Sequence, residues 1–87
     1  MAEKLHLRVI TPEETVVDEA VDMVIMRCSG GEMGVLPGHQ PHAAVLREGT
    51  LRIKTGKQER RMAVQGGLAT VRDNTLTVLT GEAEWEE

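Results

Sequence analysis

Short stretches in which apolar and polar residues alternate are the feature that most constrains how this chain folds. The side chains of a strand point alternately to opposite faces, so a period of two is typical of strands with one buried face. Three stretches have this period, at residues 5–10, 50–54 and 75–78. Their apolar positions, which we expect to point into a common core, are Leu5, Leu7, Leu51, Ile53, Leu76 and Val78.

Turn residues separate these stretches and predict how the strands connect. Residues 50–54 and 60–64 form a predicted hairpin with Gly56 in its loop. The pair Gly66-Gly67 interrupts what would otherwise be one strand from residue 60 to residue 71. Such a pair marks a bulge, a bend or a close backbone approach, so we expect a positive φ or a tight backbone contact there. Many short strands at this spacing predict an all-β sandwich or barrel.

Residues 12–23 can be interpreted in two ways from their local pattern. Thr11, Pro12 and Glu14 have the form of a helix start, with a cap, a proline at the first position and a glutamate three residues after the cap. The valines that follow have helical spacing. However, residues 15–25 are rich in β-branched side chains, which are costly in helices and suit strands. The local pattern leaves helix and strand open.

Length and composition limit the classes of protein to which the chain can belong. Its 87 residues suffice for one small domain, which we place at residues 1–87. Trp85 is the only Phe, Tyr or Trp residue, and the formal net charge is −4, whereas single-stranded nucleic acids are bound by aromatic and basic side chains. No apolar run approaches the ~20 residues of a membrane span. We therefore expect no nucleic-acid binding and no membrane insertion, and we expect the lone Cys28 to be a buried, reduced thiol.

Catalytic and metal-binding patterns are the next possibility, and the sequence argues against both. His39 and His42 are three residues apart with Cys28 and Glu32 upstream, but no spacing typical of a zinc site is present. Ser29 lacks the glycine-flanked turn of a nucleophile, and no phosphate-binding glycine motif occurs. We expect a chain that is not an enzyme and binds no metal, cofactor or nucleotide.

The stretch from residue 29 to residue 41 has the most unusual composition of the chain. It contains four glycines and two prolines, which lie on both sides of a short apolar run. Glycine permits positive φ and proline fixes φ, so we expect one rigid, irregular loop that displays Glu32 and His39. Such a loop is either a tight connection between strands or a docking surface for a partner.

Five motifs, spread over nearly the whole chain, occur in a characteristic order. The loop reads G-E-M-G-V-L-P-G-H-Q-P. An opening H-L-x-V precedes it, and a Leu-x-x-Gly-x-Leu-x-Ile segment from Leu46, the sequence A-V-x-G-G from Ala63 and a closing V-x-x-N-x-L-T-V-L follow it. In order and spacing these motifs resemble the epsilon subunit of F-type ATP synthases, called delta in mitochondria, and the loop is similar to the signature loop of that family. The resemblance implies a flattened, antiparallel β-sandwich of two sheets, and it favours turn, strand, turn, strand over a helix at residues 12–23.

The resemblance also implies a function. Family members are non-catalytic parts of the rotor that form the central stalk with the gamma subunit and touch the membrane rotor ring of c subunits, which couples ion flow to ATP synthesis. They lie at the cytoplasmic face of the bacterial inner membrane as peripheral components of the F1 complex. By motif match, the ring contact would fall on Gly31, Glu32, Met33 and Gly34. The gamma contact would fall on His39, Gln40 and His42.

Three features depart from the family pattern. Gln40 stands where a small residue is common, and His42 stands where an aliphatic residue is common. Family members usually continue into a C-terminal helical hairpin, whereas this sequence ends at Glu87, so we expect a short form without that helical domain. The alternative function is a freestanding, small ligand-binding sandwich, which usually requires aromatic platforms or clustered acids. A hydrolase subunit is disfavoured because no nucleophile constellation is present.

Overall fold

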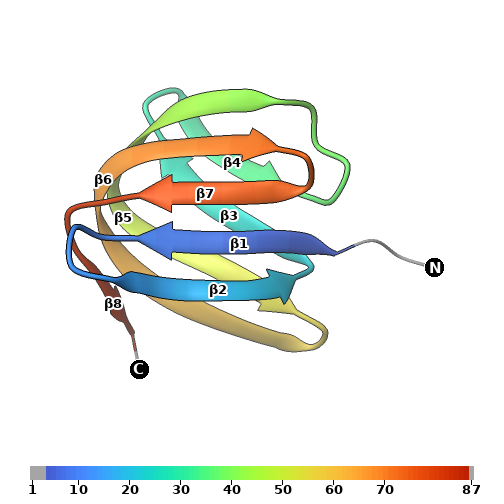
Figure 1. Ribbon diagram of the computed structural model, residues 1–87, viewed down its shortest axis with the longest axis horizontal. Helices are drawn as coiled ribbons and strands as arrows, with labels where there is room; N and C mark the ends of the chain where they lie inside the picture. Colours follow the sequence, from blue (N-terminus) through green and yellow to red (C-terminus); the bar gives the residue numbers. More distant parts are fainter. Residues whose placement is uncertain (1–3, 87) are drawn as a thin grey trace.

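The computed structural model describes residues 4–86, and these residues form eight strands and no helix (Figure 1). The expected domain also included residues 1–3 and 87, which lie outside the described residues. No described segment forms a helix that is long and apolar enough to cross a membrane. The strands are β1 (Leu5–Ile10), β2 (Thr15–Val21), β3 (Met23–Cys28), β4 (Gly31–Val35), β5 (His42–Thr55), β6 (Gln58–Arg72), β7 (Thr75–Leu79) and β8 (Ala83–Trp85).

Two layers of strands are joined by the long hairpin of β5 and β6. The hydrogen-bonded order is β2-β1-β7-β6-β5-β3-β4, and β8 pairs with β6. The second half of β6 pairs with β7 and its first half pairs with β8, so this strand belongs to both layers. Figure 1 shows β5 and β6 curving between the front layer, with β1, β2 and β7, and the layer behind it, with β3 and β4. The predicted all-β sandwich is confirmed, with continuous hydrogen bonding from one layer to the other.

One strand pair departs from the antiparallel arrangement that we expected. β1 and β7 run parallel, with Leu7 opposite Leu76 and Val9 opposite Val78. Parallel neighbours need a long connection, and here most of the chain lies between the two strands. Pairing at such a sequence separation leaves no local sign in the sequence.

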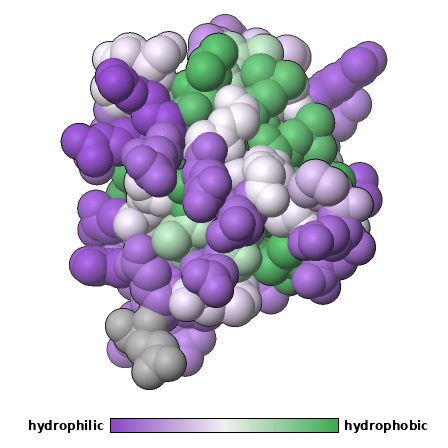
Figure 2. Space-filling view, turned by 90° about the vertical axis from the view of Figure 1, so that its left-hand side faces the viewer, coloured by the Kyte–Doolittle hydropathy of each residue, from purple (hydrophilic) through white to green (hydrophobic). Residues whose placement is uncertain are grey.

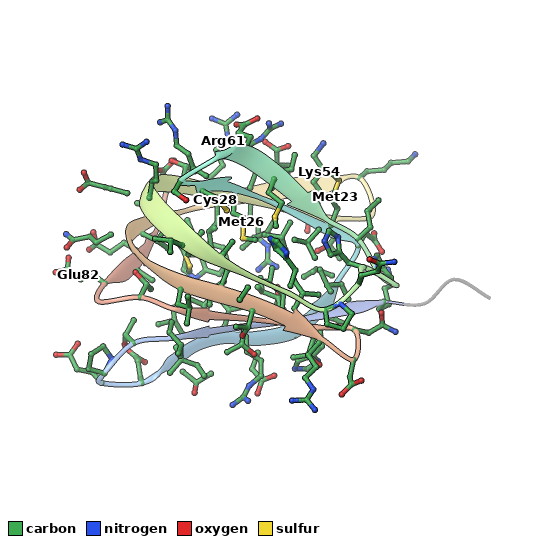
Figure 3. All side chains as sticks on the ribbon, turned by 90° about the horizontal axis from the view of Figure 1, so that it is seen from above. Met23, Met26, Cys28, Lys54, Arg61 and Glu82 are labelled. Carbon is green, nitrogen blue, oxygen red and sulfur yellow. The ribbon has the colours of Figure 1, made fainter. Side chains whose placement is uncertain are left out.

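The core between the layers is aliphatic. All six positions expected to point inward are fully buried, because each belongs to the buried set of an alternating strand. Figure 3 shows side chains filling the space between the layers, with Met26 and Cys28 on the inner side of β3. The buried hydrophobic residues are Leu5, Leu7, Val9, Val17, Val21, Val24, Met26, Cys28, Val35, Leu46, Leu51, Ile53, Met62, Val64, Ala69, Val71, Leu76 and Val78.

Residues 12–23 form a turn, β2 and the start of β3, so the strand interpretation is confirmed. The apparent helix cap at Thr11 serves a tight turn instead. The Thr11 hydroxyl oxygen accepts a hydrogen bond from the Glu14 backbone N–H at 3.3 Å, and the Thr11 N–H donates to the Glu14 carbonyl at 2.9 Å. A capping threonine therefore closes the turn between β1 and β2, after which the β-branched residues continue as a strand.

Gly66 and Gly67 have the backbone role expected of them. Both have positive φ, 84° and 125°. A Cβ atom on Gly66 would lie 3.2 Å from the carbonyl oxygen of Leu46, and one on Gly67 would lie only 1.9 Å from that of Leu79. The two glycines let β6 change layers while the neighbouring backbones stay in close contact.

Candidate docking surfaces

The glycine-rich stretch at residues 29–41 is not one loop, so that expectation was wrong. Its middle forms β4, which pairs with β3 from Cys28–Gly31 to Val24–Val35. A short turn precedes this strand and a loop at residues 36–41 follows it. The turn and the loop therefore lie at opposite ends of β4, the turn toward the left and the loop toward the right in Figure 1. Glu32 and His39 belong to two separate surfaces.

The first surface is β4 itself, which carries Gly31, Glu32, Met33 and Gly34. β4 ends the strand order, so one of its edges has no neighbouring strand within residues 4–86. Glu32 is exposed and lies opposite Arg27 of β3, on the outer face of the sheet. Met33 points the other way and packs against the core. Of the four positions expected to contact a partner, Met33 is thus the one that the fold turns inward.

The second surface is the loop at residues 36–41, with His42 at the start of β5. The His39 N–H donates to the Leu36 carbonyl at 3.1 Å, which closes a turn within the loop. The Gly38 N–H donates to the side-chain Oδ1 of Asn74 at 2.6 Å, which ties the loop to the turn between β6 and β7. Gln40 and His42 are exposed, and His39 is half-buried.

The imidazole rings of His39 and His42 lie close together, with centroids 6.4 Å apart. Among residues 4–86, no group of three or more His, Cys, Asp or Glu side chains is arranged to hold a metal ion. The ring contact brings the loop residue His39 beside the first residue of β5.

A third surface, a row of exposed apolar side chains, was missed by sequence reasoning. Val45, Leu68 and Leu79 are 58%, 41% and 46% exposed. Val45 lies opposite Leu68 in the pairing of β5 with β6, and Leu68 lies opposite Leu79 in the pairing of β6 with β7. Leu79 in turn lies opposite Ile10 of β1. The four side chains, which we call the apolar row, cross the outer face of one layer.

A shallow hollow of about 420 Å³ adjoins the apolar row. Ile10 and Leu79 belong to both, and Pro12 from the β1–β2 turn lines another side of the hollow. Gly66 and Gly67 also line it, so part of this space exists because two residues lack side chains. Figure 2 faces this end of the molecule and shows hydrophobic residues gathered toward the upper right, among hydrophilic ones.

The opposite layer presents charge on its outer face. Arg52 and Arg61 donate hydrogen bonds to Glu59, and Lys54 lies 3.9 Å from the same carboxylate. The Arg52 guanidinium holds the pKa of Glu59 below its ordinary value. In Figure 3, Lys54 and Arg61 point outward, away from the core residues Met26 and Cys28. This face has mixed charge, in contrast to the apolar row.

Cys28 is buried as expected, at 6% exposure. Desolvation by burial raises the pKa of its thiol. A raised pKa lowers the thiolate fraction, so this sulfur is poorly suited to act as a nucleophile or a metal ligand.

The sequence matches the family model described as the β-sandwich domain of the ATP synthase delta/epsilon chain over residues 4–86. It is 42% identical over 80 residues to the ATP synthase epsilon chain of Alkalihalophilus pseudofirmus, covering 92% of this chain and 60% of that one. It is 43% identical over 84 residues to the epsilon chain of Syntrophobacter fumaroxidans, covering 97% of this chain and 63% of that one. The chain thus spans less than two thirds of the length of these relatives.

Solved structures show the same fold. A chain in the Euglena gracilis mitochondrial ATP synthase, in a structure of OSCP, F1 and the c-ring, superposes with a TM-score of 0.88 at 29% identity, covering 94% of this chain and 53% of that one. A chain in the central stalk and c-ring structure of the Tetrahymena thermophila mitochondrial ATP synthase has a TM-score of 0.80 at 16% identity, covering 94% of this chain and 66% of that one. The second likeness concerns the fold alone.

Proposed function

The chain belongs to the delta/epsilon chain family of ATP synthases, and from this membership we propose that it is a non-catalytic part of the rotor. In this role it binds the gamma subunit and the membrane rotor ring, and thereby helps to couple ion flow to ATP synthesis. Its place is the cytoplasmic face of a bacterial inner membrane, as a peripheral part of the F1 complex. The bacterial sources of its similar relatives support that location.

The apolar row is the observation that carries this proposal. Exposed apolar side chains that lie next to one another on a small domain are typical of a surface that another protein covers. Val45 is the one member of the row on β5, the strand that begins at His42, so the row and one of the expected gamma contacts are three positions apart along this strand. We assign the row, the hollow beside it and the His39 loop to the gamma subunit.

The exposed end of β4 supports a second contact, with the rotor ring. Glu32 is a charged side chain on an edge strand, next to Gly31, whose φ of 121° is a conformation that favours glycine. A charged, narrow edge suits the polar loops of a membrane ring better than it suits an apolar partner. Because the His39 loop lies at the other end of β4, both partners can bind at the same time.

Substitutions on the outer face of the sandwich test this assignment. Leu68→Asp and Leu79→Asp place a carboxylate in the apolar row without removing a core side chain, since both residues are exposed. Each should weaken binding of purified gamma subunit, measured by calorimetry, by at least about tenfold, as expected for a charge buried in an apolar contact.

Thr77→Asp is the matched control. Thr77 lies two residues before Leu79 on β7, on the same outer face but opposite Arg8 instead of Ile10. This variant should bind gamma nearly as well as the unmodified chain. Folded Leu68→Asp and Leu79→Asp variants that bind with unchanged affinity would refute the assignment of the apolar row to gamma.

A further inference from the structure

A side chain from another turn of the sandwich binds the backbone of the loop at residues 36–41. The Gly38 N–H donates to Asn74 Oδ1 at 2.6 Å, across 36 positions of sequence. Packing of Leu36, the largest apolar residue of the loop, restrains it only in part, because this side chain is 51% exposed. A backbone donor fixed by a side-chain acceptor is therefore a main restraint on the loop that precedes His42.

Asn74 is itself fixed by the turn that carries it. Asp73 and Asn74 have φ values of 52° and 57°, the two positive values of a type I′ turn between β6 and β7. The carbonyl of Asn74 accepts a hydrogen bond from the His6 N–H at 2.8 Å, which attaches the turn to β1. The side-chain amide thus projects from a turn anchored on both sides, and its position depends little on the loop.

Two requirements meet at position 74. The backbone needs a residue that tolerates positive φ, and the loop needs a side-chain acceptor. Glycine meets the first requirement alone, whereas asparagine and aspartate meet both. Position 73 needs only a residue that tolerates positive φ, because the Asp73 carboxylate pairs with the exposed Arg72 at 3.8 Å instead of with the loop.

We propose that Asn74 is a positioning residue for partner binding: it holds the loop at residues 36–41, and with it His39, in the shape that meets the gamma subunit. This inference rests on the proposed function, because the loop is useful in that shape only if it is a docking surface. A loop that is already ordered loses less conformational entropy when it binds. The effect of Asn74 is therefore on affinity, through a residue that need not touch the partner.

Three variants separate positioning from general stability. Asn74→Gly keeps the positive φ and removes the acceptor, Asn74→Asp keeps both, and Asp73→Gly changes the same turn without touching the loop. Amide hydrogen exchange of Gly38 in the 87-residue chain reports on the hydrogen bond itself, and calorimetry with purified gamma subunit reports on binding. A thermal melt of each variant shows whether the fold as a whole has changed.

In Asn74→Gly, exchange at Gly38 should accelerate about threefold to tenfold, the effect of one lost hydrogen bond, and affinity for gamma should fall by a similar factor. Asp73→Gly and Asn74→Asp should both leave the exchange rate of Gly38 and the affinity for gamma close to those of the unmodified chain. Unchanged exchange at Gly38 in Asn74→Gly would overturn the inference. Faster exchange with unchanged affinity would also overturn it and would remove the His39 loop from the gamma contact, whereas the Leu68→Asp result tests the apolar row independently.

Discussion

Gly67 and the carbonyl oxygen of Leu79 are so close that a Cβ atom on Gly67 would lie 1.9 Å from that oxygen. The approach occurs where β6 begins to pair with β7, since Leu68 and Leu79 are register partners. It also places the two glycines at the edge of the apolar hollow. One backbone feature therefore serves the change of layers in β6 and the shape of the proposed gamma surface.

Replacing Gly67 by alanine should destabilise the fold strongly. The new methyl group must displace backbone, and φ of 125° is unfavourable for any residue with a side chain. We expect a loss well above the roughly 0.5 kcal/mol of a typical surface change, measured by urea unfolding. Gly81→Ala is the control, because a Cβ there meets no atom within 4 Å. Equal stability of the two variants would contradict the close approach.

Replacing Ile53 by alanine should cost about 2–5 kcal/mol, the usual range for a buried aliphatic side chain. Ile53 is fully buried and lies opposite Val24 in the pairing of β5 with β3. A domain of this size has little stability to spare, so the thermal midpoint should fall by many degrees. Val45→Ala, in the same strand at a position that is 58% exposed, should leave the midpoint nearly unchanged. A small effect at Ile53 would show that β5 does not face the core as described.

Asp22 should make stability depend on acid pH. Its carboxylate pairs with Lys4 and accepts a hydrogen bond from the Gly56 N–H at 2.6 Å, and these partners lower its pKa below the ordinary value of 3.8. A group whose pKa is lower in the folded state stabilises the fold above its unfolded pKa. That contribution is lost as pH falls from about 3.8 through the lower, folded value.

Thermal melts between pH 6 and pH 2 check this linkage. The unmodified chain should lose more stability on acidification than Asp22→Asn, because the variant has no carboxylate to protonate. Asp73→Asn, at a side chain that is 92% exposed, is the control and should behave like the unmodified chain. If Asp22→Asn lost as much stability as the unmodified chain, Asp22 would not contribute to the acid response.

The core could be predicted from the sequence because buried and exposed residues alternate along each strand, so neighbouring residues show which face points inward. Ile53 and Leu76 were assigned to the core correctly for this reason. The backbone role of Gly67 was predicted correctly because two adjacent glycines within a strand pattern mark an irregular backbone.

β4 was missed because glycine occupies two of its five positions and hides the alternation of outward Glu32 with inward Met33 and Val35. Its strand conformation also depends on pairing with β3. A strand can be predicted from local sequence only where polar and apolar side chains mark its two faces.

The candidate site could be predicted only in part, since its main features arise from distant residues. Val45, Leu68 and Leu79 form a row through the pairing of three strands, and each alone resembles an ordinary apolar residue of a strand. The bond from Gly38 to Asn74 likewise joins two turns far apart in sequence. Such contacts become visible only when the strand order and register are known.

Site-specific photo-crosslinking in the assembled ATP synthase tests most directly the claim that two surfaces of one rotor part meet two partners. A photoreactive amino acid would be placed at position 68 in the apolar row, at position 32 on β4, or at position 61 on the charged face as a control. We predict that position 68 crosslinks to the gamma subunit, that position 32 crosslinks to a ring subunit, and that position 61 gives neither product. Crosslinking of position 68 to the ring, or of neither position 68 nor position 32 to either partner, would contradict the claim.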